Sequence, residues 1–225
     1  MKIATWNLER PTKNGHKTPV ILQYLNKLNA DILVLTETNE CIDLSTEYEH
    51  FQTDKYEGVN CKQGDRQVSI FSKYPITRHL KTFRADTSLC VEISTPLGNL
   101  IVYGTIIGNL GNRGDQFKND LDKQLLDFEN YAKSNNFCII GDLNISFSDN
   151  YYFTKEGRAK LINTFELLEM KIMTEQIANN IDHIILSKSF FKDRIFKEGF
   201  WNNTENKKER LSDHKGVFIE IFDRI

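Results

Sequence analysis

Polar residues stand at the end of an apolar run in the segment FCIIGDLNIS, residues 137–146. The run is typical of a buried strand, but it stops on Gly141 and Asp142, and Asn144 follows two residues later. In extended backbone, side chains two residues apart project from the same face, so the acid and the amide would share one pocket. A core would not choose these polar groups, which makes the segment a candidate for chemistry.

Four other strand ends repeat this pattern of polar groups that a core would not choose. They are Asn7 after the first predicted strand, Glu37 after DILVLT, Asp182 within NIDH, and the pair Asp213 and His214 before the last predicted strand. Each one alone has an ordinary explanation as a turn, a cap or a solvated strand end. Hydrolysis of a phosphate diester needs a cation, a base for water and donors for the developing charge, and this set offers such groups.

Strands outnumber helices among the elements that must position these residues. Compact apolar runs predict strands, and apolar stripes at helical spacing predict helices. The predicted strands cover residues 2–8, 31–36, 67–72, 89–94, 100–105, the run from 137, 181–186 and 217–221, and the predicted helices cover 19–28, 115–134 and 158–170. Helices interrupt the strands irregularly, which favours mixed sheets over a strictly parallel array. The polar stretch 201–210 is predicted to be a mobile loop.

The composition is that of an ordinary soluble globular protein, and we expect residues 1–225 to form one domain. Of the 225 residues, 40% are hydrophobic and 27% charged, and 29 basic against 31 acidic residues leave a formal charge of -2. No global basic field marks a nucleic-acid binder, although a local patch or a metal ion can hold phosphates. With no Cys-x-x-Cys pair, signal peptide or membrane span in view, we expect a cytoplasmic monomer that does not bind membranes.

The order of the polar motifs along the chain resembles that of a known superfamily. Trp-Asn, Leu-Thr-Glu, Gly-Asp-x-Asn, Ile-Asp-His and a C-terminal Ser-Asp-His follow one another as in the endonuclease/exonuclease/phosphatase superfamily of DNase-like, metal-dependent phosphodiesterases and phosphatases. The resemblance extends over essentially the whole chain. It implies a four-layer α/β/β/α sandwich, in which two mixed β-sheets are flanked by helices and the active site lies at one edge.

The resemblance also implies roles for individual residues. Glu37 is expected to be the principal metal carboxylate, with Asn7 beside it and Asp213 nearby, bound directly or through water. Two departures from the family pattern bear on this site. Relatives often carry Tyr or His where this chain has Thr105 or Ile106, and abasic-site endonucleases carry Asp where this chain has Glu9, whose role stays open.

The expected catalytic residues are those that would act on water and on the phosphate. Asp142 is expected to orient or deprotonate the attacking water, and Asn144 to donate to the phosphate. His214 would donate to the phosphoryl oxygen, with Asp182 fixing its orientation and supporting its charge. His183 neighbours Asp182 in a strand and should point to the opposite face, which favours a packed structural histidine.

Two loop arginines beside predicted strands are further candidates for substrate binding. Arg66 lies in GDRQ and Arg113 in GNRG, and a guanidinium in either place could meet substrate phosphates. A solvated loop arginine is an equally good interpretation of each.

The sequence therefore predicts a phosphoesterase that depends on Mg²⁺ or Mn²⁺, most directly a phosphodiesterase or nuclease acting on nucleic acid or a nucleotide-like substrate. Two alternatives stay open. One is a phosphomonoesterase, or a lipid or inositol phosphate phosphodiesterase, of the same superfamily, and the other is a non-catalytic binding protein on the same fold. A dinuclear metallophosphatase of the calcineurin-like type is disfavoured, because the Gly-Asn-His and Gly-His-x-His motifs that it needs are absent.

Overall fold

Two six-stranded sheets lie face to face in the computed structural model, which describes residues 1–55, 61–133, 136–202 and 210–223. The first sheet has the order β11-β12-β1-β2-β4-β3 and the second the order β5-β6-β7-β8-β10-β9. Both are mixed, because β1 is parallel to β2 but antiparallel to β12, and β8 is parallel to β7 but antiparallel to β10. The strands of the first sheet are β1 (Lys2–Asn7), β2 (Ile32–Asn39), β3 (Glu49–Gln52), β4 (Asp65–Ser72), β11 (Arg194–Trp201) and β12 (Gly216–Asp223). Those of the second are β5 (Ile76–Leu80), β6 (Ser88–Thr95), β7 (Gly98–Ile106), β8 (Phe137–Asp142), β9 (Met170–Ile172) and β10 (Asp182–Ser187).

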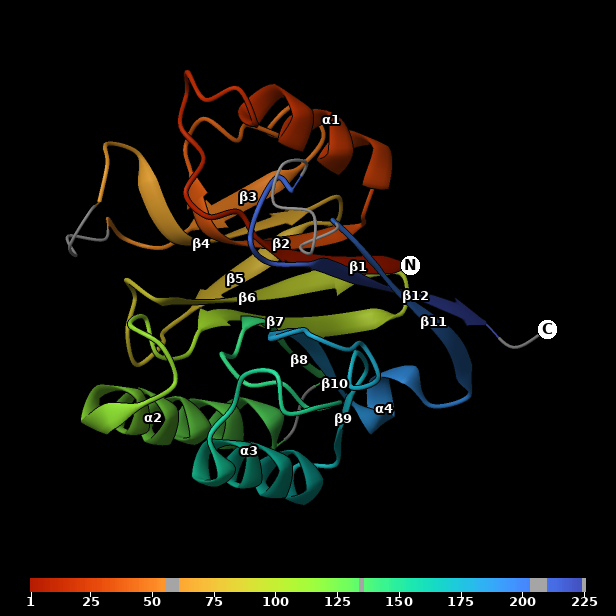
Figure 1. Ribbon diagram of the computed structural model, residues 1–225. Helices are drawn as coiled ribbons and strands as arrows, with labels where there is room; N and C mark the ends of the chain where they lie inside the picture. The colour runs from red at the N-terminus through yellow and green to blue at the C-terminus, as the bar shows by residue number, and fades with distance from the viewer. Residues whose placement is uncertain (56–60, 134–135, 203–209, 224–225) are drawn as a thin grey trace.

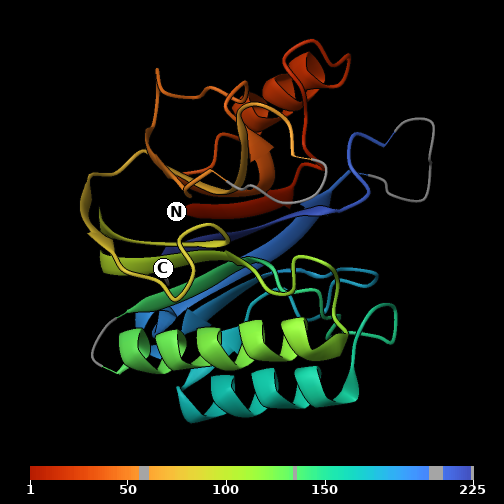
Figure 2. The same ribbon diagram turned by 90° about the vertical axis from the view of Figure 1, so that its left-hand side faces the viewer.

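Helices cover the outer face of each sheet (Figures 1 and 2). Helix α1 (Thr18–Leu28) lies over the first sheet, while α2 (Gly114–Ala132) and α3 (Lys155–Leu167) lie side by side over the second. The short α4 (Lys188–Phe191) follows β10. These four layers confirm the predicted α/β/β/α sandwich of two mixed sheets. Among the described helices, none has the length and apolar character needed to cross a membrane.

Most inner strands are buried on both faces, and their alternation decides which polar side chain reaches the site. In β8, Cys138 and Ile140 pack in the core between the two sheets, whereas Phe137 and Ile139 pack under α2 and α3. Because the side-chain period of a strand is two residues, Asp142 continues the row of Cys138 and Ile140. The last residue of the strand therefore brings a carboxylate to the end of the inter-sheet core.

The predicted elements agree with the structure except at its margins. All eight predicted strands are present, and the four strands that the sequence did not predict, β3, β5, β9 and β11, are the edge strands of the two sheets. Helix α3 begins at Lys155 rather than at 158, because the Thr154 hydroxyl caps it by accepting a hydrogen bond from the Gly157 backbone at 3.2 Å. Most of the predicted loop 201–210 lies outside the described residues, and Trp201 ends β11.

Candidate active site

Strand ends from both sheets meet at one edge of the sandwich. In the first sheet, β1 ends at Asn7, which lies opposite Thr36 of the parallel strand β2. In the second sheet, Asp142 lies opposite Ile106 of β7 on one side and Asp182 of β10 on the other. The registers thus align the ends of neighbouring strands, and the polar residues that close these strands come together.

A buried hydrogen bond joins the two sheets at this edge. The Asn7 amide donates to Asp142 Oδ2 at 3.1 Å, and both side chains are buried. The Ser212 hydroxyl, in the loop before β12, donates to the Asn7 backbone carbonyl at 2.6 Å. Three segments that are far apart in sequence are therefore fastened to one another at Asn7.

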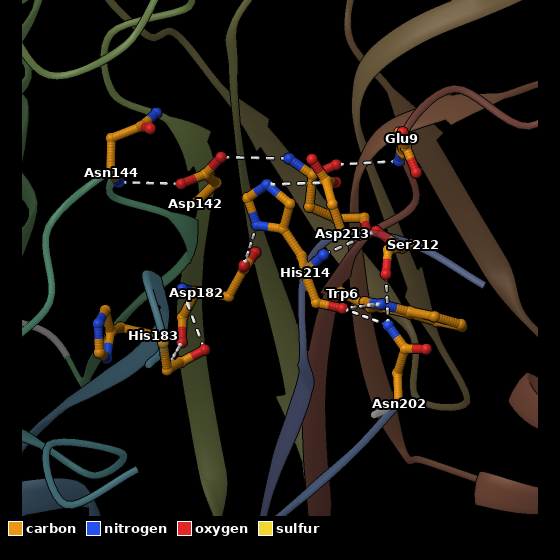
Figure 3. A network of polar contacts seen from close by, with 12 residues as sticks. Trp6, Glu9, Asp142, Asn144, Asp182, His183, Asn202, Ser212, Asp213 and His214 are labelled. Carbon is orange, nitrogen blue, oxygen red and sulfur yellow. Dashed lines mark hydrogen bonds and ion pairs between the residues drawn. The ribbon is translucent and has the colours of Figure 1, made fainter. Parts of the chain in front are cut away.

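His214 lies in the same loop as Ser212 and points into the site (Figure 3). Its Nδ1 lies 2.6 Å from Oδ2 of Asp182, whose side chain is 1% exposed. The His214 backbone is held as well, since its carbonyl accepts a hydrogen bond from Trp6 Nε1 at 3.1 Å and its amide donates to the Ser212 hydroxyl at 3.1 Å. The imidazole is therefore fixed from two directions, and its Nε2 lies 3.8 Å from Asp213 Oδ1.

The buried charges of the site shift one another's protonation. Burial raises the pKa of Asp142 to about 7, with Asp182 and Glu37 adding to the rise and His214 opposing it. Burial alone would lower the pKa of His214, but the attraction of Asp182, Asp142 and Asp213 and the hydrogen bond to Asp182 raise it to about 10. The carboxylates around His214 thus favour its cationic form, while burial favours the neutral form of Asp142.

Asn144 lies beside Asp142, but through a turn and not through continued extended backbone. The strand stops at Asp142, and Asn144 has a φ of 53°, in the left-handed region that asparagine tolerates better than most residues. Its backbone amide donates to Asp142 Oδ1 at 2.9 Å. Its side-chain amide donates to the carbonyls of Ile107 at 3.0 Å and Gly108 at 3.3 Å, so the amide is turned toward the β7 side of the site.

Glu37 comes from β2, one strand away from Asn7. Simple alternation would put it on the α1 side with Leu33 and Leu35, but its φ of 41° interrupts the extended backbone. The Arg10 backbone amide donates to the Glu37 carbonyl at 2.8 Å, and Arg10 Nη2 lies 3.4 Å from Glu37 Oε2. The Glu37 side chain is 24% exposed, which leaves its carboxylate accessible.

Asp213 and Glu9 lie at the outer rim. The Asp213 side chain is 46% exposed, with Oδ1 3.8 Å from His214 Nε2. The Glu9 backbone amide donates to Asn7 Oδ1 at 3.0 Å, while its carboxylate lies 4.0 Å from Lys17 Nζ. Asp213 is thus near the catalytic candidates, and Glu9 supports the site through its backbone.

The two loop arginines lie in different surroundings. Arg66 forms an ion pair with Glu40, and its side chain is 14% exposed. Arg113 is exposed at the start of α2, and its neighbour Asn112 donates to the Asn144 carbonyl at 3.0 Å. Arg113 therefore lies next to a residue that contacts Asn144, whereas Arg66 is paired with Glu40 on the β2–β4 side.

The segment that departs from the family pattern offers other polar groups. The Thr105 hydroxyl donates to Gln124 Oε1 at 2.6 Å and is buried, and Ile106 is buried as well. Asn109 follows Ile106 by three residues, and both polar atoms of its side-chain amide are buried with no hydrogen-bond partner among the described residues. Sequence reasoning passed over Asn109, because nothing in its local sequence marks it.

His183 lies on the far side of β10 from Asp182, as alternation predicts (Figure 3). Its ring is fully buried, with Nε2 2.9 Å from the Ile145 carbonyl and Nδ1 3.1 Å from the Thr174 hydroxyl. Burial lowers its pKa to about 4, against small opposing contributions from backbone groups. This histidine is neutral and structural.

Comparison with known proteins shows the family to which the chain belongs. A model of the Endonuclease/Exonuclease/phosphatase family matches residues 4–214. The chain belongs to this family. None of the curated protein sequences matches it significantly.

Solved structures of the endonuclease/exonuclease/phosphatase fold superpose on nearly the full chain. A 3′ phosphatase, NExo, from Neisseria bound to product DNA hairpin is 15% identical, with a TM-score of 0.74 and 99% of each chain covered. An AP endonuclease from Archaeoglobus fulgidus is 14% identical, with a TM-score of 0.73 and 98% of each chain covered. A family protein from Leptotrichia buccalis is 14% identical, with a TM-score of 0.66 and 99% of each chain covered. At these identities the likeness establishes the fold.

The carboxylate oxygens at the edge of this family member fit a divalent cation. Asp142 and Asp182 each offer a carboxylate oxygen and His214 offers a ring nitrogen, and these three atoms lie within 4.8 Å of one another. Asp182 Oδ1 is buried and has no hydrogen-bond partner among the described residues, which is costly for a carboxylate oxygen unless something else satisfies it. Carboxylate oxygens of this kind are the ligands that Mg²⁺ and Mn²⁺ prefer.

A cleft of about 500 Å³ opens beside these groups. Asp182, Asp213 and His214 line its inner end, and Asn144 also borders it. The rest of its wall comes from residues that sequence reasoning missed, namely Tyr151, Tyr152, Asn179, Asn180, Ile181, Arg210 and Lys215. Asn180 and Ile181 directly precede β10 and were noted only as part of its motif. The other residues lie in loops, where neither periodicity nor motif spacing marks a position.

Proposed function

We propose that the protein is a divalent-metal-dependent phosphodiesterase that hydrolyses phosphate ester bonds in nucleic acid or a nucleotide-like substrate. The observation that carries the proposal is the convergence of Asp142, Asp182 and His214, with ligand atoms within 4.8 Å, at an edge that also holds Asn7 and Glu37. Such a set combines a base, an acid and oxygen ligands around one point. These are the components that hydrolysis of a phosphate ester requires.

Glu37 is the proposed principal ligand of Mg²⁺ or Mn²⁺, with Asn7 beside it and Asp213 nearby. Its accessible carboxylate and the Asn7 position on the adjacent strand support this assignment. When bound, the cation supplies charge that offsets the negative phosphoryl oxygens. Arg10 holds the Glu37 carboxylate in place from the other side.

Asp142 and His214 are the proposed proton-handling residues. Asp142 takes the proton of the attacking water, a role supported by its burial and by the neighbouring carboxylates, which raise its pKa and with it its basicity. His214 donates from Nε2 to the phosphoryl oxygen, because Asp182 engages Nδ1 and keeps the ring charged. Asn144 is the proposed amide donor to the phosphate, a role that requires its side-chain amide to leave the carbonyls of Ile107 and Gly108.

The preference for nucleic acid over other diesters is also a proposal. It is supported by the neighbours, which include a 3′ phosphatase bound to product DNA and an AP endonuclease. Arg113, and less directly Arg66, remain predicted phosphate contacts. We further propose that residues 1–225 act as a single domain, since the site draws on strands from Asn7 to the loop of His214. The monomeric state and the cytoplasmic location stay predictions from the sequence.

Hydrolysis of bis-p-nitrophenyl phosphate tests the reaction class. We expect turnover that requires Mg²⁺ or Mn²⁺, is abolished by EDTA and is lost in Asp142→Asn. The matched control is Asp122→Asn, which changes a carboxylate that is 54% exposed on α2 and should leave the rate unchanged. Absence of metal-dependent turnover of this diester and of every nucleic acid would overturn the proposal in favour of a binding protein.

A substrate panel separates the remaining alternatives. Single-stranded DNA, duplex DNA, RNA, p-nitrophenyl phosphate, inositol phosphates and sphingomyelin are compared for wild type and His214→Ala. We expect the highest His214-dependent kcat/KM on nucleic acid. A higher value on the monoester or on the lipid and inositol substrates would move the assignment to those branches.

A further inference from the structure

Two neighbouring tyrosines stand exposed on the wall of the cleft beside the candidate active site. Tyr151 is 58% exposed and Tyr152 is 37% exposed, although large aromatic side chains usually bury their rings. Both line the same cleft as Asp182 and His214. The proposed hydrolysis gives these rings no task, so their exposure needs a separate explanation.

The segment that carries the tyrosines is held in place by one carboxylate. Asp149 accepts hydrogen bonds from the Ser146 hydroxyl at 2.8 Å, from the Tyr151 backbone amide at 2.9 Å and from the Asn179 backbone amide at 2.7 Å. Burial opposes the charge, but these hydrogen bonds dominate and lower its pKa to about 2. Asp149 therefore joins the tyrosine segment to the loop before β10, and the two loops form adjoining parts of the cleft wall.

Helix α3 supports the same segment from the outside. Arg158 donates to the Asp149 carbonyl and lies 3.7 Å from the centroid of the Phe153 ring. The Tyr152 carbonyl also accepts a hydrogen bond from the Ser146 backbone amide at 2.7 Å. The two rings are thus presented by a braced turn, which reduces the entropy lost when a ligand binds them.

The remaining groups in the cleft suit a nucleotide. Arg210 and Lys215 add positive charge to the wall, and Lys215 Nζ is held 2.7 Å from the Ala178 carbonyl. Aromatic rings offer a face on which any base can stack, and cations track the phosphate backbone. An inositol polyphosphate would call for a denser set of cations, and a lipid chain would call for aliphatic walls.

We infer that Tyr151 and Tyr152 form a stacking site for a nucleobase of a nucleotide adjoining the scissile phosphate. This inference rests on the proposed function and adds to it a substrate class, nucleic acid that is single-stranded or unpaired at the cleft. A base within a duplex keeps both faces covered by its neighbours, so only an unpaired or splayed base can use the two rings.

The kinetic test compares a substrate that has bases with one that has none. For wild type, Tyr151→Ala, Tyr152→Ala and the double variant, kcat/KM is measured on single-stranded DNA and on methyl p-nitrophenyl phosphate. We expect the double variant to lose about tenfold or more on the oligonucleotide, mainly through KM, because stacking on one aromatic ring contributes about that much to binding. The rate on the base-free diester should stay unchanged, and the Phe variants should retain wild-type values.

Tyr24→Ala is the matched control, since Tyr24 is a 45% exposed tyrosine on α1 at the other outer layer. It should change neither substrate's kinetics. Equal kcat/KM for wild type and the double variant on the oligonucleotide, with intact hydrolysis of the diester, would overturn the stacking site and leave the proposed function standing.

A binding measurement makes the inference testable even if the protein proves to hydrolyse nothing. In EDTA, where no metal-dependent turnover occurs, a trinucleotide with a central 2-aminopurine is titrated with wild type and the double variant. We expect quenching of the 2-aminopurine fluorescence by wild type and at least tenfold weaker binding by the double variant. Undiminished quenching by the double variant would contradict the inference, independently of any result on catalysis.

Discussion

Two histidines on opposite sides of β10 show how surroundings decide the chemistry of one side-chain type. His183 packs into the layer beneath α3, where its ring nitrogens meet a hydroxyl and a carbonyl and its pKa is lowered to about 4. His214 lies on the other side, at the edge of the sandwich, where three aspartates raise its pKa to about 10. His183 is fully buried and the His214 side chain is only 15% exposed, so exposure alone does not explain the opposite shifts.

The two pKa values differ because His183 has neutral partners and His214 has carboxylate partners. Neutral partners leave the desolvation of a charged imidazole uncompensated, and the neutral ring prevails. Asp182, which is itself buried, overcompensates that cost for His214. The face of β10 that lies under α3 thus serves packing, and the opposite face, which carries Asp182, is the one that we propose serves proton transfer. The following variants test this division.

The largest effect should follow from removing the charged ring. His214→Gln keeps much of the volume but has no group that can donate a proton from a cationic nitrogen. We expect the metal-saturated kcat on bis-p-nitrophenyl phosphate to fall by about 10²–10⁴-fold, the usual contribution of a general acid or base. Steady-state rates with the unfolding midpoint measured alongside would show this, and a drop below about threefold would remove His214 from the proposed mechanism.

Asp182→Asn should remove the carboxylate that keeps His214 charged. Without the carboxylate, the pKa of His214 should fall from about 10 toward its ordinary value near 6.5, and kcat at pH 8 should fall by about 10²-fold. An NMR titration of the ring in metal-free protein follows the pKa directly. An unchanged titration would mean that Asp142 and Asp213 suffice to charge the ring.

The raised pKa of His214 should also make the metal-free protein less stable at alkaline pH. A group whose pKa is higher in the folded than in the unfolded chain stabilises the fold fully below the unfolded value, here 6.5, and loses this contribution as pH rises to about 10. Between pH 8 and 10, where Asp142 with its pKa of about 7 has largely finished titrating, the unfolding free energy should fall by up to about 1.4 kcal/mol per pH unit. Urea unfolding in EDTA checks the slope, which should flatten in His214→Gln.

The smallest expected effect is on the face of β10 under α3, and it concerns stability alone. His183→Leu leaves the Ile145 carbonyl and the Thr174 hydroxyl with fewer partners in a buried layer. We expect the unfolding free energy to drop by about 1–3 kcal/mol, while kcat per folded molecule stays at the wild-type value. A loss of kcat comparable to that of His214→Gln would show that the two faces of β10 are not functionally separate.

The sequence predicted the inner structure of the molecule better than its margins. The eight inner strands pack apolar side chains against layers on both faces, so each appears in the sequence as a compact apolar run. All eight were predicted. The four edge strands are short or half-exposed, so their residues lack such a pattern. An edge strand forms because its backbone hydrogen-bonds to the neighbouring strand, and the local pattern of apolar residues does not predict that pairing.

The candidate site shows the same limit in its details. Alternation correctly placed Asp182 and His183 on opposite faces of β10, because β10 is regular. It could not place Glu37 or Asn144, whose backbones turn into the left-handed region, with φ of 41° and 53°. The tyrosines of the cleft were missed because the hydrogen bonds of Asp149, and not any periodicity, put them there.

In the proposed function, this edge of the sandwich binds a divalent cation through Glu37 and uses it to hydrolyse phosphate diesters. The most direct measurement is the initial rate on bis-p-nitrophenyl phosphate across a Mg²⁺ or Mn²⁺ titration, for wild type and Glu37→Gln side by side. We predict saturable activation of wild type and at least about tenfold weaker apparent metal affinity in Glu37→Gln, as is usual when a carboxylate ligand or its support is lost. Metal-independent turnover, or identical titration curves for the two proteins, would contradict the claim.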